Sequence, residues 1–134
     1  MRVSLPRSSS ATATACRTGR FWNEPNLPLF FGFVDKRPER YTQLLKAAYP
    51  AIKAVQPDST IVAGGLSPAF EQDAPPIFVN AMYANGAKGY FDAMAMHPYV
   101  FPRGLAVDPM NGWSDVEVVR QIMVDTATAP RRSG

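Results

Sequence analysis

The chain has 134 residues, of which 46% are hydrophobic, with a formal net charge of +3 and one cysteine. This length fits one ordinary domain, and the hydrophobic fraction excludes a globally disordered chain. The single cysteine, Cys16, excludes an intrachain disulfide, and with no histidine or acid near it in the sequence we expect no metal-binding or catalytic role for it.

The positive charge belongs to the two ends of the chain. Residues 1–20 contain four arginines and no acid, residues 131–132 are both arginine, and without these six residues the segment 21–129 has a net charge of −3. A nucleic-acid surface needs clustered basic residues with aromatic residues between them, so we expect no nucleic-acid partner. No apolar run is long enough to cross a membrane, and the N-terminal arginines precede no signal-like apolar segment. We therefore expect no membrane partner, and the compartment stays unassigned.

The first half of the chain predicts a tail, a strand and a helix. Residues 1–20 are rich in Ser, Thr, Ala and Arg without apolar periodicity, which predicts a disordered or irregular tail. Phe21-Trp22 is strand-like, and the prolines that follow predict a loop over 27–38. A helix is then predicted, with Pro50 at a kink or in a first turn and Pro57 at its end. Its apolar stripe comprises Tyr41, Leu44, Leu45, Ala48, Ile52 and Val55.

The second half predicts two further strand–helix units. Residues 61–63 form a short apolar strand ended by Gly64-Gly65, and residues 91–96 form another. Between them, Pro75-Pro76 opens a helix from residue 77 to about 84, which Asn85-Gly86 terminates. A capping box of Ser114 and Glu117 predicts a third helix, whose apolar face is formed by Val118, Val119, Ile122 and Met123.

The alternation of short apolar strands with helices predicts an α/β fold with a parallel sheet. We assign residues 21–129 to the domain and residues 130–134 to a frayed tail. A closed barrel of eight such units needs about 250 residues, so this chain is expected to form only part of one.

Glu24 is the residue that most strongly predicts chemistry. It follows a strand-like aromatic pair and precedes Pro25, in the sequence Trp22-Asn23-Glu24-Pro25-Asn26. Cleavage of a glycosidic bond needs one carboxylic acid that stays protonated, and burial against aromatic surface raises a carboxyl pKa. The alternative is an ordinary solvated loop glutamate beside a packing tryptophan.

The pentapeptide resembles the fourth-strand motif of clan A glycoside hydrolases, the retaining (β/α)8 enzymes, with xylosidase-like and cellulase-like families nearest. The resemblance extends from about residue 21 to about residue 125. It includes residues 47–53, 61–65 and 82–87, and it continues through 91–99, which end in His97-Pro98-Tyr99. It implies a partial TIM barrel of about three βα units, similar to strands 4 to 6 and their helices.

The resemblance implies a role for each matching residue. Glu24 would be the general acid/base, Asn23 would hold the 2-hydroxyl of the sugar, and His97 and Tyr99 would line the sugar site. His97 could instead be a strand-end residue bonded to backbone, and Tyr99 a packed residue of the rim. Trp113, in the loop after residues 97–99, could stack on a sugar or cover the third helix. We expect a carbohydrate substrate, no cofactor and no metal.

The sequence departs from the family at the second carboxylate. A retaining enzyme needs a nucleophile about 5 Å from the acid/base, and the family supplies it from the seventh strand. The acids after residue 113 are Asp115, Glu117 and Asp125, all on or beside the predicted third helix. We therefore expect a fragment that lacks its nucleophile. The alternatives are an inactive remnant, a carbohydrate-binding half-barrel, or a half that assembles with a separate half or with a copy of itself.

Overall fold

A three-stranded parallel sheet forms the centre of the fold. The structure is a computed structural model that describes residues 17–100, 104 and 106–128. Strands β1 (Thr18–Asn23), β2 (Thr60–Leu66) and β3 (Ala93–Met96) pair in the order β1-β2-β3. The helices are α1 (Pro28–Phe31), α2 (Arg37–Val55), α3 (Pro75–Ala84) and α4 (Ser114–Thr128), with a 3-10 turn at Glu71–Asp73. The predicted α/β class with a parallel sheet is confirmed.

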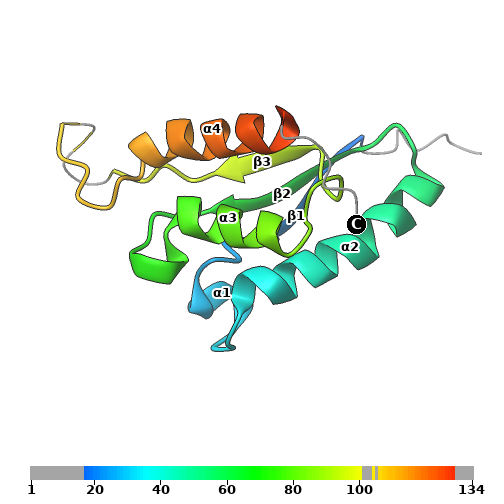
Figure 1. Cartoon of the computed structure of the whole chain (residues 1–134), viewed down its shortest axis with the longest axis horizontal. Helices are drawn as coiled ribbons and strands as arrows, with labels where there is room; N and C mark the ends of the chain where they lie inside the picture. Colours follow the sequence, from blue (N-terminus) through cyan, green and yellow to red (C-terminus); the bar gives the residue numbers. More distant parts are fainter. Residues whose placement is uncertain (1–16, 101–103, 105, 129–134) are drawn as a thin grey trace, which may run out of the picture.

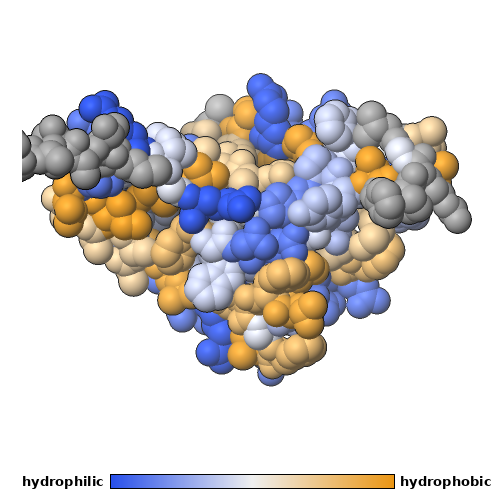
Figure 2. Space-filling model, turned by 180° about the vertical axis from the view of Figure 1, so that it is seen from behind, coloured by the Kyte–Doolittle hydropathy of each residue, from blue (hydrophilic) through white to orange (hydrophobic). Residues whose placement is uncertain are grey.

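The larger helices α2, α3 and α4 all lie on one face of the sheet (Figure 1). Between this face and the helices lies a core that contains Tyr41, Leu45, Ala63, Leu66, Phe78, Val79, Met82, Ala87 and Val119. Strand residues alternate between faces, so Phe21, Ala63 and Met94 pack toward this core. The opposite face, which we call the open face, presents Arg20 and Val62; Figure 2 looks onto it and shows hydrophilic residues gathered near its middle.

The strands differ from the prediction at their ends. β1 begins at Thr18, so residues 18–20 belong to the sheet and not to the tail. These three residues contain no apolar side chain, and main-chain pairing holds them in the sheet, with Thr18 opposite Thr60 and the Thr60 amide donating to the Arg17 carbonyl at 2.6 Å. β2 continues through Gly64 and Gly65 instead of ending before them. β3 is shorter than predicted and begins at Ala93.

The first helical region also differs from the prediction. Residues predicted as a loop contain α1 and the start of α2, where Pro38 occupies a first-turn position whose missing amide needs no partner. Pro50 lies inside α2, which continues through it. Tyr41 is buried, but Leu44 is 41% exposed and Val55 is 82% exposed, so the predicted stripe is too wide. Leu44 lies beside the row that faces the sheet, and Val55 is the last residue of the helix.

The predicted stop of α3 at Asn85-Gly86 is confirmed, since Asn85 caps the helix and Gly86 has a φ of +81°. The predicted capping box of α4 is not formed, since among the described residues no hydrogen bond joins Ser114 to Glu117, and the Ser114 hydroxyl donates to the Asn111 carbonyl at 3.4 Å. The carboxylate of Asp108 instead accepts hydrogen bonds from the two amides just before α4, at 2.7 and 2.8 Å. Val118, predicted on the apolar face of α4, is 46% exposed.

Candidate active site

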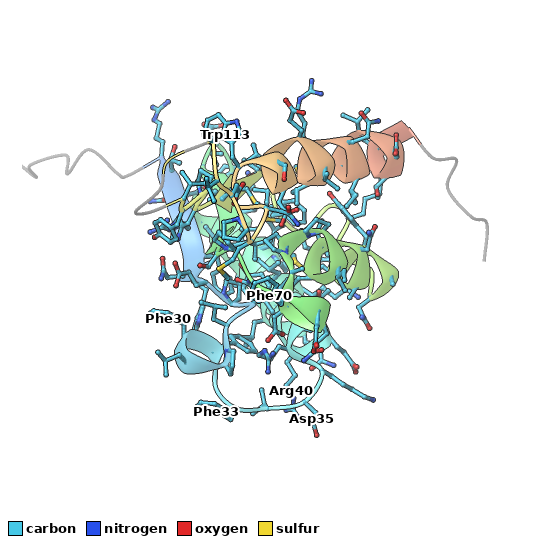
Figure 3. All side chains as sticks on the ribbon, turned by 90° about the vertical axis from the view of Figure 1, so that its left-hand side faces the viewer. Phe30, Phe33, Asp35, Arg40, Phe70 and Trp113 are labelled. Carbon is cyan, nitrogen blue, oxygen red and sulfur yellow. The ribbon has the colours of Figure 1, made fainter. Side chains whose placement is uncertain are left out.

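Glu24 and His97 follow the carboxyl ends of β1 and β3, with β2 between them. The carboxyl ends of parallel strands meet at one edge of a sheet, which is where α/β proteins place their ligands. Glu24 is only 6% exposed, so the alternative of a solvated loop glutamate is wrong. Figure 3 views the molecule from this end.

The main chain around Glu24 adopts an uncommon conformation. Trp22 and Glu24 have φ values of +78° and +46°, which lie in the left-handed region that non-glycine residues seldom occupy. The Glu24 amide donates to the Gly65 carbonyl at 2.9 Å. Earlier along β1 and β2, the Tyr41 hydroxyl bridges the two strands. It donates to the Phe21 carbonyl at 2.6 Å and accepts from the Gly64 amide at 2.7 Å. These bonds hold the strained backbone that turns the Glu24 side chain inward.

Asn26 fixes the loop after Glu24, a role that the sequence analysis missed. Its side chain is fully buried and its amide nitrogen donates to the carbonyls of Ser67 and Asp73, at 2.7 and 2.8 Å. Its side-chain oxygen accepts from the Ser67 amide at 3.2 Å. The loops after β1 and β2 are thereby tied together beside Glu24. The signal in the sequence is an amide residue close to a proline in a loop, which is too common to be diagnostic.

The two glycines of β2 make room for the site. A Cβ added at Gly65 would lie 2.3 Å from Nε2 of His97 and within 2.8 Å of two further ring atoms. A Cβ at Gly64 would lie 2.9 Å from the Pro25 ring. The imidazole of His97 therefore packs directly against the β2 backbone, and this close approach explains why the strand contains glycine where the sequence analysis ended it.

A chain of hydrogen bonds joins Arg20, His97 and Glu24. Nδ1 of His97 lies 2.8 Å from Oε1 of Glu24, and Nε2 lies 2.8 Å from an Nη of Arg20. Both ring nitrogens thus bond to side chains, so the alternative of a histidine bonded to backbone is wrong. Arg20 was missed because the sequence analysis placed it in the tail. Strand alternation puts it on the face opposite Phe21 once β1 is extended to Thr18.

Tyr99 completes the cluster around Glu24. Its ring centroid lies 5.4 Å from that of His97, and the side chain is 58% exposed. Desolvation raises the pKa of Tyr99, and the charge of Glu24 and a hydrogen bond to it act in the same direction, while Arg20 opposes them. Tyr99 is therefore a rim residue that touches the carboxylate, and it stays protonated over the neutral range.

Asn23 and Trp113 lie at the same end of the sheet. Asn23 is the last residue of β1 and is partly buried beside Gly65. Trp113 is 53% exposed at the start of α4, and a Cβ at the preceding Gly112 would lie 2.7 Å from the Tyr99 carbonyl. In the part of the chain that the structure describes, no hydrogen bond joins either side chain to the Glu24 cluster.

Exposed aromatic side chains gather at this end of the molecule. Among the described residues, every exposed aromatic side chain lies either near the end of β1 or in a segment that follows a strand, and four of them are labelled in Figure 3. This group comprises Trp22, Phe30, Phe33, Phe70, Tyr99 and Trp113. Aromatic rings offer flat apolar surface for a ligand that also has apolar faces. We refer to these six residues as the aromatic rim.

The acids considered for the second carboxylate lie on α4, as expected. Asp115 is buried in its first turn, where desolvation and the nearby charge of Asp108 raise its pKa. Asp125 accepts a hydrogen bond from Gln121 on the same helix. A surface hollow lined by Gly19, Phe21 and the end of α2 contains no acid and no histidine.

Within the described residues, no group of three or more His, Cys, Asp or Glu side chains is arranged to hold a metal ion. None of the helices in that part of the chain is long and apolar enough to span a bilayer. Comparisons with protein-family models, curated proteins and solved structures found no match to this chain.

Proposed function

We propose that this chain carries the proton-donating half of a retaining glycoside hydrolase site, on part of a (β/α)8 barrel. The observation that supports it best is the buried carboxyl group of Glu24, held by His97 and Tyr99 at the carboxyl end of parallel strands. A buried carboxyl group with fixed neighbours suits proton transfer, because its position relative to a ligand is controlled.

In this proposal Glu24 first donates its proton to the oxygen of the leaving group while the bond from that oxygen to the anomeric carbon breaks. A carboxylate nucleophile then bonds to the anomeric carbon. Glu24, now ionised, takes a proton from the water that displaces this carboxylate. Asn23 is proposed to hold the 2-hydroxyl of the sugar, and Trp113 to stack on a sugar ring.

The nucleophile is proposed to come from outside the described residues, from further chain or from a second polypeptide that covers the open face. Within the described residues β1 and β3 are the outer strands of the sheet, and outer strands can pair with additional strands. A second barrel portion would extend the sheet from these edges and bring its own strand ends to Glu24.

A second candidate function is binding of carbohydrate without cleavage. The aromatic rim favours it, because stacking on exposed aromatic rings needs no second carboxylate. The two functions differ in whether Glu24 affects bond cleavage, so one set of substrates separates them.

The experiment uses aryl β-glycosides of graded leaving-group basicity, with azide supplied as an external nucleophile. Azide would form a carbon–nitrogen bond as the bond to the aryl oxygen breaks, while Glu24 donates its proton to that oxygen. A dinitrophenolate leaves without a proton donor, whereas a more basic phenolate requires one. We expect Glu24→Gln to slow release of the basic phenolate by about 10²–10⁴-fold and to leave the dinitrophenolate nearly unaffected.

Glu39→Gln is the matched control, because Glu39 lies on α2 and pairs with Lys36 at 3.9 Å. This variant should cleave both substrates like the unmodified chain. Release of the basic phenolate that survives Glu24→Gln would remove Glu24 from the mechanism. Oligosaccharide binding without azide-dependent release would support the binding function instead.

A further inference from the structure

The hydrogen bonds of His97 fix which ring nitrogen carries its proton. A guanidinium group has five N–H donors and no acceptor. The Nε2 atom that lies 2.8 Å from Arg20 must therefore be the unprotonated nitrogen, which accepts. In the neutral ring the proton is then on Nδ1, which donates to Oε1 of Glu24 at 2.8 Å.

We infer that Arg20 is a positioning residue that holds His97 as the neutral Nδ1–H tautomer and thereby orients the proton of Glu24. Because Oε1 accepts from His97, the proton of the Glu24 carboxylic acid resides on the other oxygen, Oε2. The tautomer of His97 follows from the hydrogen bonds alone, whereas its consequence for proton donation rests on the proposed function.

The arrangement also excludes a competing state of the site. If His97 bore protons on both nitrogens, it would form an ion pair with Glu24, which stabilises the ionised carboxylate and opposes proton donation. The guanidinium of Arg20 opposes that state, because its N–H groups would face another N–H donor and its charge would face another cation.

The residues around His97 restrict the orientation of its ring. The main chain of Gly65 packs against the His97 ring, so that a Cβ added at Gly65 would lie only 2.3 Å from Nε2. The charged and titratable groups that face the ring are Arg20 from β1, Glu24 after β1 and Tyr99 after β3. The side chain of His97 is 16% exposed, so solvent competes weakly for its nitrogens.

Nitrogen NMR of the full chain tests this inference directly. His97 is the only histidine in the sequence, so labelling histidine ring nitrogens gives a single pair of resonances. At pH 7 we expect the pattern of a protonated Nδ1 and an unprotonated Nε2. Arg20→Met should replace it with the Nε2–H pattern or the doubly protonated pattern, whereas Arg20→Lys, which keeps a cationic donor, should retain the Nδ1–H form.

Arg17→Met is the matched control, because Arg17 is an exposed arginine just before β1 and should leave the resonances unchanged. An Nε2–H or doubly protonated pattern in the unmodified chain would overturn the inference. So would an unchanged pattern in Arg20→Met with backbone spectra of a folded protein. If Arg20→Met fails to fold, the spectra of the unmodified chain and of Arg20→Lys still decide.

Aryl glycosides then separate the inference from the proposed function. If both hold, Arg20→Met slows release of a basic phenolate at least tenfold and leaves dinitrophenolate release little changed. If the expected tautomer is seen but no variant or substrate shows release that depends on Glu24, the positioning of His97 stands and the proposed function fails.

Discussion

Gly65→Ala tests whether the site depends on direct packing of His97 against the β2 backbone. The added methyl group would lie 2.3 Å from Nε2, 2.7 Å from Cε1 and 2.8 Å from Cδ2 of His97. Unstrained contacts between such atoms are about 3.5 Å, so the ring must move by about 1 Å. The main chain at Gly65 does not have a positive φ, so the substitution acts through this collision and not through backbone strain.

The displacement affects both hydrogen bonds of the ring, which are 2.8 Å long. A hydrogen bond to a charged group contributes about 1.5–3 kcal/mol, but the Arg20 bond lies at the surface and contributes less. We expect Gly65→Ala to lower the free energy of unfolding by roughly 2–4 kcal/mol, allowing for partial relaxation. Under the proposed function, a misplacement of about 1 Å would also reduce acid-assisted cleavage by about 10²-fold.

Urea unfolding and the ring-nitrogen spectrum of His97 measure the two effects. Gly19→Ala is the matched control in β1, because nothing lies within 4 Å of a Cβ built there. We expect that control to be neutral or to stabilise the protein by up to about 1 kcal/mol. Gly65→Ala with the urea midpoint and His97 resonances of the unmodified chain would refute the packing argument.

Three further substitutions test the supports of the site. Burial raises the pKa of Tyr41 from 10.0 to about 12. The contribution of this pKa shift to the free energy of unfolding, about 3 kcal/mol, is therefore complete below pH 10 and is lost between pH 10 and 12. Tyr41→Phe leaves the Gly64 amide and the Phe21 carbonyl without this partner, so it should lower the free energy of unfolding by about 2–4 kcal/mol and remove much of the stability loss between pH 10 and 12. A variant that still loses stability steeply over this pH range would contradict the role given to Tyr41. Asn26→Ala removes three buried hydrogen bonds and should cost roughly 2–4 kcal/mol in urea unfolding, and an unchanged midpoint would show that these bonds do not hold the loops. Although burial works to raise it, hydrogen bonds from the Ile61 amide, Lys53 and a tyrosine hydroxyl lower the pKa of Asp92. Stability from Asp92 is therefore present above its usual pKa of 3.8 and is lost as the pH falls through the lowered value. Asp92→Asn should lower stability at neutral pH and flatten the acid limb of the stability curve, and a variant with the full acid dependence would argue against this role.

The sequence was sufficient where the information is local. Apolar side chains at helical spacing located α2 and α4, and Pro75-Pro76 with Asn85-Gly86 bounded α3, because these signals act within a few residues. The order of strands and helices was also sufficient for the α/β class, since short apolar strands separated by helices are buried best in a parallel sheet. Of the residues that the sequence analysis named, the structure brings His97 and Tyr99 next to Glu24, while their catalytic role stays a proposal.

The sequence was insufficient where a neighbour distant in the chain decides. Residues 18–20 contain no apolar side chain, and only their pairing with β2 makes them part of the sheet. The prediction that β2 ends before Gly64 was wrong, because the space beside these glycines is filled by residues more than 30 positions away. The predicted capping box was also wrong, although here the contact that is formed is local, since Asp108 accepts hydrogen bonds from the amides of Gly112 and Trp113.

By itself the sequence pointed to Glu24, His97 and Tyr99 as candidate residues, since residue type and position after an apolar run are local properties, but it did not point to Arg20. The tertiary structure alone decided how those residues are connected. Arg20 meets His97 across 77 positions of sequence, and His97 meets Glu24 across 73. A hydrogen bond requires atoms to come within about 3 Å with suitable direction. Strand register and the missing side chain of Gly65 set that geometry, and no spacing along the chain encodes it.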